Sequence, residues 1–135
     1  MRNAKIKISS TEEDDNSEIT LFGKAWEENF KQFIEYDETS QADMGVFKTL
    51  VFYDQNSLTI RRIGDVEMDM VFDENKLSQF PISTKYGDFD VVLHTETLKI
   101  ERLENGADIE IIYDLSFSNQ EIIEHTIKMI FRYLN

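Results

Sequence analysis

The sequence has no cysteine, one proline and five glycines among its 135 residues. The absence of cysteine excludes disulfides and thiolate metal sites, and it is typical of proteins from a reducing cytoplasm. No glycine-rich phosphate loop and no Gly-x-Ser-x-Gly elbow is present. No apolar run is long enough to cross a bilayer, and the first residues do not resemble a signal peptide. We therefore expect a cytoplasmic location and no membrane partner.

Basic residues are also scarce. The chain carries 14 lysines and arginines against 27 acidic residues, which gives a formal net charge of -13. Such a chain repels nucleic acids and anionic lipids, and no cluster of lysine or arginine in the sequence offsets this repulsion. The composition predicts no nucleic-acid partner. We interpret the acidic excess as a contribution to solubility.

The sequence offers no recognisable catalytic or metal-binding motif. Its two histidines, His94 and His125, lie far apart and lack the spacing of a zinc site. We interpret both as polar residues that face solvent. The acidic run 11–18 lacks the spacing of a calcium-binding loop and is expected to form a solvated loop. The sequence therefore predicts no enzyme, no cofactor and no metal site.

Most of the chain shows the alternation of apolar and polar residues that is typical of half-buried strands. In residues 65–73, for example, four apolar side chains alternate with acidic ones. A helix is the competing interpretation for residues 25–36, and a helical turn for 121–125, but aromatic and β-branched residues favour strands in the first stretch. The expected strands are 5–9, 19–26, 30–36, 46–53, 58–63, 65–72, 77–85, 89–103, 109–117 and 126–134.

Three local features refine this pattern. Pro81 interrupts one strand, so that strand must lie at a sheet edge or contain a bulge. The apolar parity changes between Leu93 and Leu98, which requires a bulge or a sharp bend. Tight turns are expected at 86–88, where Gly87 supplies a positive φ, and at 104–106. Eight to ten antiparallel strands with short turns predict an all-β sandwich or closed barrel in a single domain, 1–135. Long strands with few edge-protecting devices favour the closed barrel.

Several short segments carry a resemblance to a known family. They are FIEYDE at 33–38, LTIRRIG at 58–64, MVF at 70–72, TKYG at 84–87 followed by Thr95, and YDL at 113–115. By their order and spacing the chain resembles the YwiB-like family of small bacterial proteins, from about Ile19 to its end. The resemblance implies a lipocalin-like, calycin-type antiparallel barrel. Because the function of that family is unknown, it implies no catalytic residues. Ser83 and the nearby Pro81 depart from the family pattern.

Arg62 is the strongest candidate for a ligand-binding residue. Leu58, Ile60 and Arg62 share one parity, so the arginine is expected on the apolar side of its strand, where its charge needs acceptors. One interpretation is structural: an ion pair with an acid of segment 35–38, namely Glu35, Asp37 or Glu38, or a hydrogen bond to a strand carbonyl. The other is a clamp for a ligand carboxylate or phosphate. Thr84, Tyr86 and Thr95 are candidate hydroxyl donors at the same rim, although each is also an ordinary strand or turn residue.

Two functional hypotheses follow. A barrel of about eight strands is either filled by side chains or holds one small ligand. The first hypothesis is a barrel that binds a small apolar or anionic molecule, with Arg62 as its polar anchor. The second is a solid barrel, filled by its many aromatic residues, that acts through protein–protein contacts as a homodimer. Residues 46–53 are apolar on both parities, which favours a partner surface near Phe52.

Overall fold

The computed structural model describes the chain except for residues 40–45, 65–66, 85–86, 118–121 and 135. Ten antiparallel strands form one sheet in the order β6-β5-β4-β3-β2-β1-β10-β9-β8-β7. Their bounds are β1 Arg2–Glu12, β2 Asp15–Glu28, β3 Lys31–Thr39, β4 Val46–Tyr53, β5 Leu58–Gly64, β6 Met68–Phe72, β7 Leu77–Thr84, β8 Gly87–Leu103, β9 Gly106–Phe117 and β10 Ile123–Tyr133. The strand interpretation of residues 25–36 is confirmed, and residues 123–125 are also strand rather than helix.

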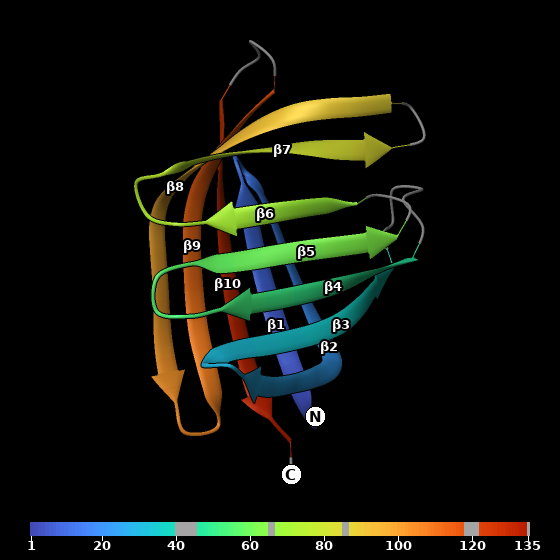
Figure 1. The fold of residues 1–135 in the computed structure, drawn as a ribbon, viewed down its shortest axis with the longest axis vertical. Coiled ribbons are helices and arrows are strands. Elements are labelled where there is room, and N and C mark those ends of the chain that lie inside the picture. The colour runs from blue at the N-terminus through green and yellow to red at the C-terminus, as the bar shows by residue number, and fades with distance from the viewer. Residues whose placement is uncertain (40–45, 65–66, 85–86, 118–121, 135) are drawn as a thin grey trace.

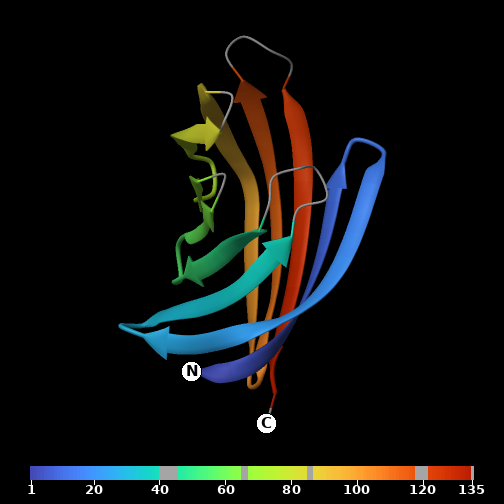
Figure 2. The ribbon, with the colours of Figure 1, turned by 90° about the vertical axis from the view of Figure 1, so that its right-hand side faces the viewer.

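The sheet curls into two layers whose strands cross. The long strands β8, β9, β10 and β1 form one layer, and β3 to β7 run across it (Figure 1). Strand β2 curves from one layer into the other (Figure 2), pairing with β1 along most of its length and with β3 from Lys24 onward. Gly23 makes this corner feasible, because a Cβ atom there would collide with the backbone carbonyl oxygen of Glu35.

Strand β8 contains the predicted irregularity. Its register with β9 shifts between Thr95 and Thr97, so that Glu96 is the extra residue of a β-bulge. The bulge explains how Leu93 on one parity and Leu98 on the other both contact the core. The change of parity in the sequence is thus confirmed as a bulge, and Gly87 has the expected positive φ of 124°.

The barrel is nearly closed, with a seam between its two terminal strands. Strand β6 pairs with β5 and strand β7 with β8, but within the described residues no ladder joins β6 to β7. Pro81 lies in β7 opposite Asp90, so its predicted position in an edge strand is confirmed. The prediction of an all-β antiparallel barrel of eight to ten strands is confirmed as well.

The turn between β6 and β7 is held against β8 at its bulge. The amide of Asp73 donates to Thr95 Oγ1 over 3.2 Å. The amide of Asn75 donates to the Thr95 carbonyl over 2.8 Å, and the Thr95 amide donates to the Lys76 carbonyl over 3.3 Å. Glu74 adds a side-chain bond, because its Oε1 accepts from the Leu98 amide at 3.1 Å. These bonds fasten both terminal strands to β8 beside the seam.

The acidic run 11–18 is not the solvated loop that its composition predicts. Strand β1 continues to Glu12 and β2 begins at Asp15, so that only Glu13 and Asp14 form the turn. Residues 10–12 gain a second partner because they also pair with β10, for example Glu12 with His125. Pairing on both sides outweighs the low strand propensity of acidic residues, a long-range effect that local composition does not report.

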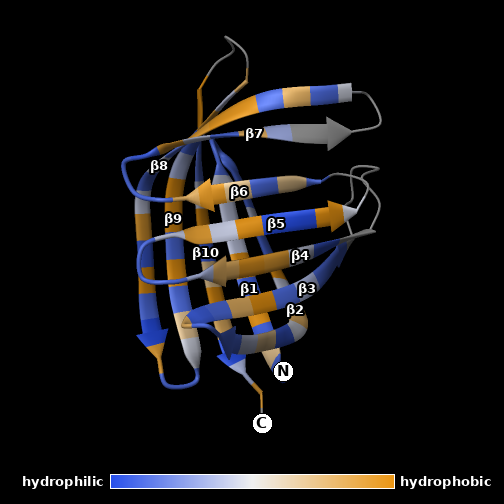
Figure 3. Ribbon diagram, in the orientation of Figure 1, coloured by the Kyte–Doolittle hydropathy of each residue, from blue (hydrophilic) through white to orange (hydrophobic). Residues whose placement is uncertain are grey.

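The core lies between the two layers. Hydrophobic and polar residues alternate along much of β8 to β10, whereas most of β4 is hydrophobic (Figure 3), and buried aromatic rings from both layers meet there. They are Tyr36, Tyr53, Phe72, Phe80, Tyr113 and Phe131. Among the residues that the structure describes, no helix has the length and hydropathy to span a membrane.

Replacing Thr95 by Val tests the bonds at the seam. The change keeps the volume but leaves the Asp73 amide without its acceptor, so we expect a loss of about 1–3 kcal/mol in the free energy of unfolding. Urea denaturation measures the change. The control variant Thr20→Val, at an exposed position of β2, should shift that free energy by less than about 0.5 kcal/mol. Equal effects of the two variants would contradict the structural role of Thr95.

Candidate functional site

A cavity of about 370 Å³ lies between the two layers. Its volume falls within the range of small-molecule sites, about 300–1,000 Å³. Residues from β1, β2, β5, β6, β7, β9 and β10 contribute to its lining, which combines an apolar wall with a polar mouth. The apolar wall consists of Met68, Met70, Phe80, Tyr113, Leu115 and Ile127, and the polar residues are Ser10, Thr11, Glu12, Asp15, Asn16, Ser17, Arg62, His125 and Thr126.

Arg62 is on the cavity wall. It lies on β5 between Thr49 of β4 and Met68 of β6, and it shares its inward parity with the buried Leu58 and Ile60. The preceding Arg61 points to the other face, where it forms a two-bond ion pair with Asp69 at 2.9 and 3.2 Å. Glu35, one of the expected partners of Arg62, forms its ion pair with Lys48 at 3.3 Å. Two adjacent arginines therefore have opposite environments.

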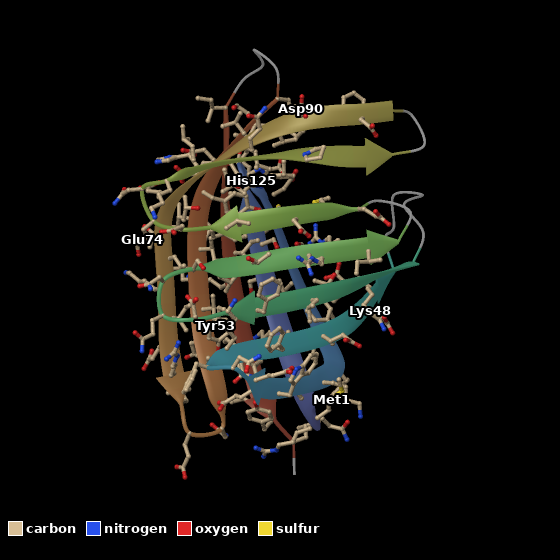
Figure 4. All side chains as sticks on the ribbon, viewed as in Figure 1. Met1, Lys48, Tyr53, Glu74, Asp90 and His125 are labelled. Carbon is tan, nitrogen blue, oxygen red and sulfur yellow. The ribbon has the colours of Figure 1, made fainter. Side chains whose placement is uncertain are left out.

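His125 and Tyr113 form a stacked pair at the cavity. Their ring centroids are 5.1 Å apart with an interplanar angle of 10°. The ring of Tyr113 also contacts that of Phe72 in an edge-to-face arrangement, with the ring centroids 4.9 Å apart. The imidazole Nδ1 lies 3.8 Å from Glu12 Oε2, an ion pair when His125 is protonated. In Figure 4, His125 is seen toward the β7 end of the barrel, whereas Tyr53 lies toward the opposite end.

The structure corrects the interpretation of His125 as a residue that faces solvent. Its side chain is only 17% exposed, whereas that of His94 is 42% exposed. The His94 Nδ1 atom lies 3.5 Å from Asp114 Oδ2. Sequence reasoning missed His125 because its burial depends on the pairing of β10 with both β1 and β9. The alternation of Ile127, Met129 and Phe131 extended backward would have placed it on the inward face.

Burial and the Arg62 charge act in opposite directions on the pKa of two buried tyrosines, Tyr113 and Tyr36. Burial raises the pKa of Tyr113 to about 12, the Arg62 charge acts in the opposite direction, and Glu12 adds to the rise. Burial also raises the pKa of Tyr36, with a further contribution from Glu38 and an opposing one from Arg62. The Arg62 charge thus opposes the rise in the pKa of two buried tyrosines, in agreement with its inward parity on β5 and its place in the cavity lining.

Of the other predicted ligand residues, Thr95 is not brought together with Arg62. Thr95 is buried at the bulge of β8 and does not line the cavity. The backbone of Thr84 belongs to β7, but its side chain and the whole of Tyr86 lie outside the described residues. A ligand role for these three residues stays a prediction, and the structure gives Thr95 a defined bond within the barrel instead.

Two other hollows have linings that are more polar than that of the cavity. A groove of about 1050 Å³ is walled largely by the turns 54–56 and 73–76, most of whose residues are exposed. A third hollow of about 520 Å³ lies at the opposite end of the barrel, between Tyr53, Tyr133 and Arg102. Among the described side chains, no group of three or more His, Asp or Glu is placed to hold a metal ion.

Comparisons with known proteins agree with the fold. A model of the family described as a domain of unknown function, DUF1934, matches residues 3–129. The crystal structure of the ywiB protein from Bacillus subtilis is similar, with a TM-score of 0.88 and 19% identity over 99% of this chain and 93% of that chain. No curated protein matches the chain. The resemblance to the YwiB-like family is confirmed, and at this identity the solved structure bears on the fold alone.

The raised pKa of Tyr113 predicts a specific loss of stability at high pH. The phenol ionises near 10 when unfolded and near 12 when folded, so its contribution to stability is complete below pH 10. This contribution is lost as the pH rises to 12, up to about 2–3 kcal/mol. Urea denaturation from pH 9 to 12 should show a smaller loss for Tyr113→Phe than for the wild type. Identical losses would contradict the prediction.

Proposed function

Because the chain belongs to the DUF1934 family, whose function is unknown, we propose its function from geometry: it binds a small molecule inside the barrel with Arg62 as the polar anchor. The observation that carries this proposal is the position of Arg62 on the wall of an interior cavity whose body is built of apolar side chains. A guanidinium in such surroundings offers a planar, two-pronged donor to a carboxylate or a similar anionic group.

The apolar wall defines the body of the ligand. Two methionines, Met68 and Met70, and the ring of Phe80 form the side near the seam, with Leu115 and Ile127 opposite. Methionine side chains adapt to irregular shapes, so this wall suits an aliphatic or aromatic body rather than one rigid outline. The stacked rings of Tyr113 and His125 add a flat surface beside it.

The mouth of the cavity limits the charge of the ligand. Glu12 and Asp15 lie in the lining, against one permanent positive charge from Arg62. A polyanion such as a nucleoside triphosphate would meet repulsion from these carboxylates and from a chain of net charge -13. The ligand class that fits is therefore a molecule with an apolar body and a single anionic or hydrogen-bond-accepting head group.

Two fluorescent probes that differ in one group test the proposal. We expect 1-anilinonaphthalene-8-sulfonate, which carries an anionic sulfonate, to bind in the cavity. The variant Arg62→Met should weaken its affinity about tenfold or more, the effect of losing a hydrogen bond to a charged group. N-phenyl-1-naphthylamine has the same rings without the sulfonate, and its affinity should change little. Fluorescence titration measures both affinities.

The adjacent arginine supplies the control. Arg61→Met changes the same side chain on the same strand, but its guanidinium pairs with Asp69 on the outer face. This variant should bind both probes like the wild type. If Arg61→Met and Arg62→Met weaken sulfonate binding equally, or if Arg62→Met leaves it unchanged, Arg62 is not the anchor. Circular dichroism of each variant verifies that the barrel is intact.

A further inference from the structure

The outer face of the crossing layer carries a row of aligned side chains, three aromatic rings followed by the buried Thr59 and by Val71. Cross-strand pairing aligns Trp26 with Phe33, Phe33 with Phe52, Phe52 with Thr59 and Thr59 with Val71. The rings of Trp26 and Phe33 stack at 5.3 Å, and those of Phe33 and Phe52 at 5.6 Å. These three rings remain partly exposed, and Val71 is 38% exposed. We call these five residues the aromatic row.

The charges around the aromatic row are balanced, unlike those of the chain as a whole. The paired outward positions of β2 to β6 hold four basic and four acidic residues, so the net charge of -13 resides elsewhere. Ion pairs already join Lys48 to Glu35 and Arg61 to Asp69 on this face. The basic residues are Lys24, Lys31, Lys48 and Arg61, and the acidic residues are Glu28, Glu35, Asp37 and Asp69.

The hairpin that carries two of the rings also holds a strained aromatic residue. Asn29 and Phe30 form the turn between β2 and β3 with φ angles of 52° and 66°, and Phe30 is fully exposed. Positive φ is unfavourable for a bulky side chain. Such strain is concentrated at functional positions, so an exposed phenylalanine held in this way points to a role for this end of the row beyond folding.

We propose that the aromatic row is an interface at which a second copy of this chain packs, face to face, about a twofold axis. Two copies of net charge -13 repel each other at an average surface, but this face is locally neutral. Its β2 and β3 positions carry a single excess negative charge, and its β4 to β6 positions carry a single excess positive charge. A twofold axis along the strands places each half of the face over its complement, as a self-complementary interface requires.

The size of this face suits a concentration-dependent dimer. Five strands and four rows of outward residues cover roughly 20 Å by 20 Å at ordinary strand spacings. That area, about 400 Å² per copy and about 800 Å² in total, is below that of stable specific interfaces and in the range of weak, transient ones. The stacked rings extend from β2 at one side of this face to β4 in its middle, and aromatic residues are enriched among those that dominate binding energy. The interface does not include the interior cavity, so the proposed dimer does not depend on the proposed ligand.

Trp26 allows a direct test because it is the only tryptophan in the chain. Analytical ultracentrifugation from about 1 µM to about 1 mM, the range of weak to moderate complexes, should show a monomer converting to a dimer. Over the same range, quenching of the Trp26 fluorescence by acrylamide should fall as the partner covers the row. A monomer at every concentration would overturn the proposal. A dimer whose Trp26 stays equally open to acrylamide would overturn it too.

Matched variants assign the contact to this face. Phe52→Lys and Val71→Lys should each weaken self-association about tenfold or more, because each variant introduces a charge into an apolar contact. Ile130→Lys, on β10 in the other layer, is the control, because Ile130 has the same 38% exposure as Val71. It should dimerise like the wild type. Val71→Lys lies on an edge strand and keeps the test decisive if Phe52→Lys fails to fold. An equal effect of Ile130→Lys would contradict the proposed interface.

Discussion

The barrel depends on the attachment of one turn to one bulge. Strands β6 and β7 end the sheet, and no ladder joins them to each other among the described residues. What brings them together is the turn 73–76, whose backbone is bonded to Thr95 at the point where Glu96 bulges out of β8. Pairing alone would leave an open, curled sheet. The bulge changes the direction of β8, and the bonds to Thr95 hold the two terminal strands beside each other.

The interior cavity is a consequence of this way of closing. Because the layers cross, side chains fill the middle of the barrel, where Phe72 and Phe131 are fully buried. Near the seam, the wall is made instead by side chains of β5, β6 and β7 on one side and of β1, β2, β9 and β10 on the other. Arg62 enters this space because it follows the inward parity of β5. The two hypotheses drawn from the sequence therefore concern different regions of one molecule, an interior cavity and an outer aromatic face.

The sequence predicted features that local patterns determine. Pro81 indicated an edge strand, the change of parity between Leu93 and Leu98 indicated a bulge, and alternation along β5 placed Arg62 on the inner face. It failed where long-range pairing decides the outcome. The acidic residues 11–18 form a hairpin because β10 supports β1, and His125 stacks on Tyr113 because β9 lies beside β10. The bond between Asp73 and Thr95 was likewise not predicted, because it joins residues 22 positions apart.

The central claim is that the interior cavity holds a small molecule, and native mass spectrometry of the protein purified from its own host tests it most directly. Spectra under gentle conditions and after denaturation report any molecule bound without covalent attachment. We predict an additional mass that is lost on denaturation, persists in Arg61→Met and is absent from Arg62→Met. A protein that carries no additional mass under gentle conditions, in wild type and variants alike, would contradict the claim.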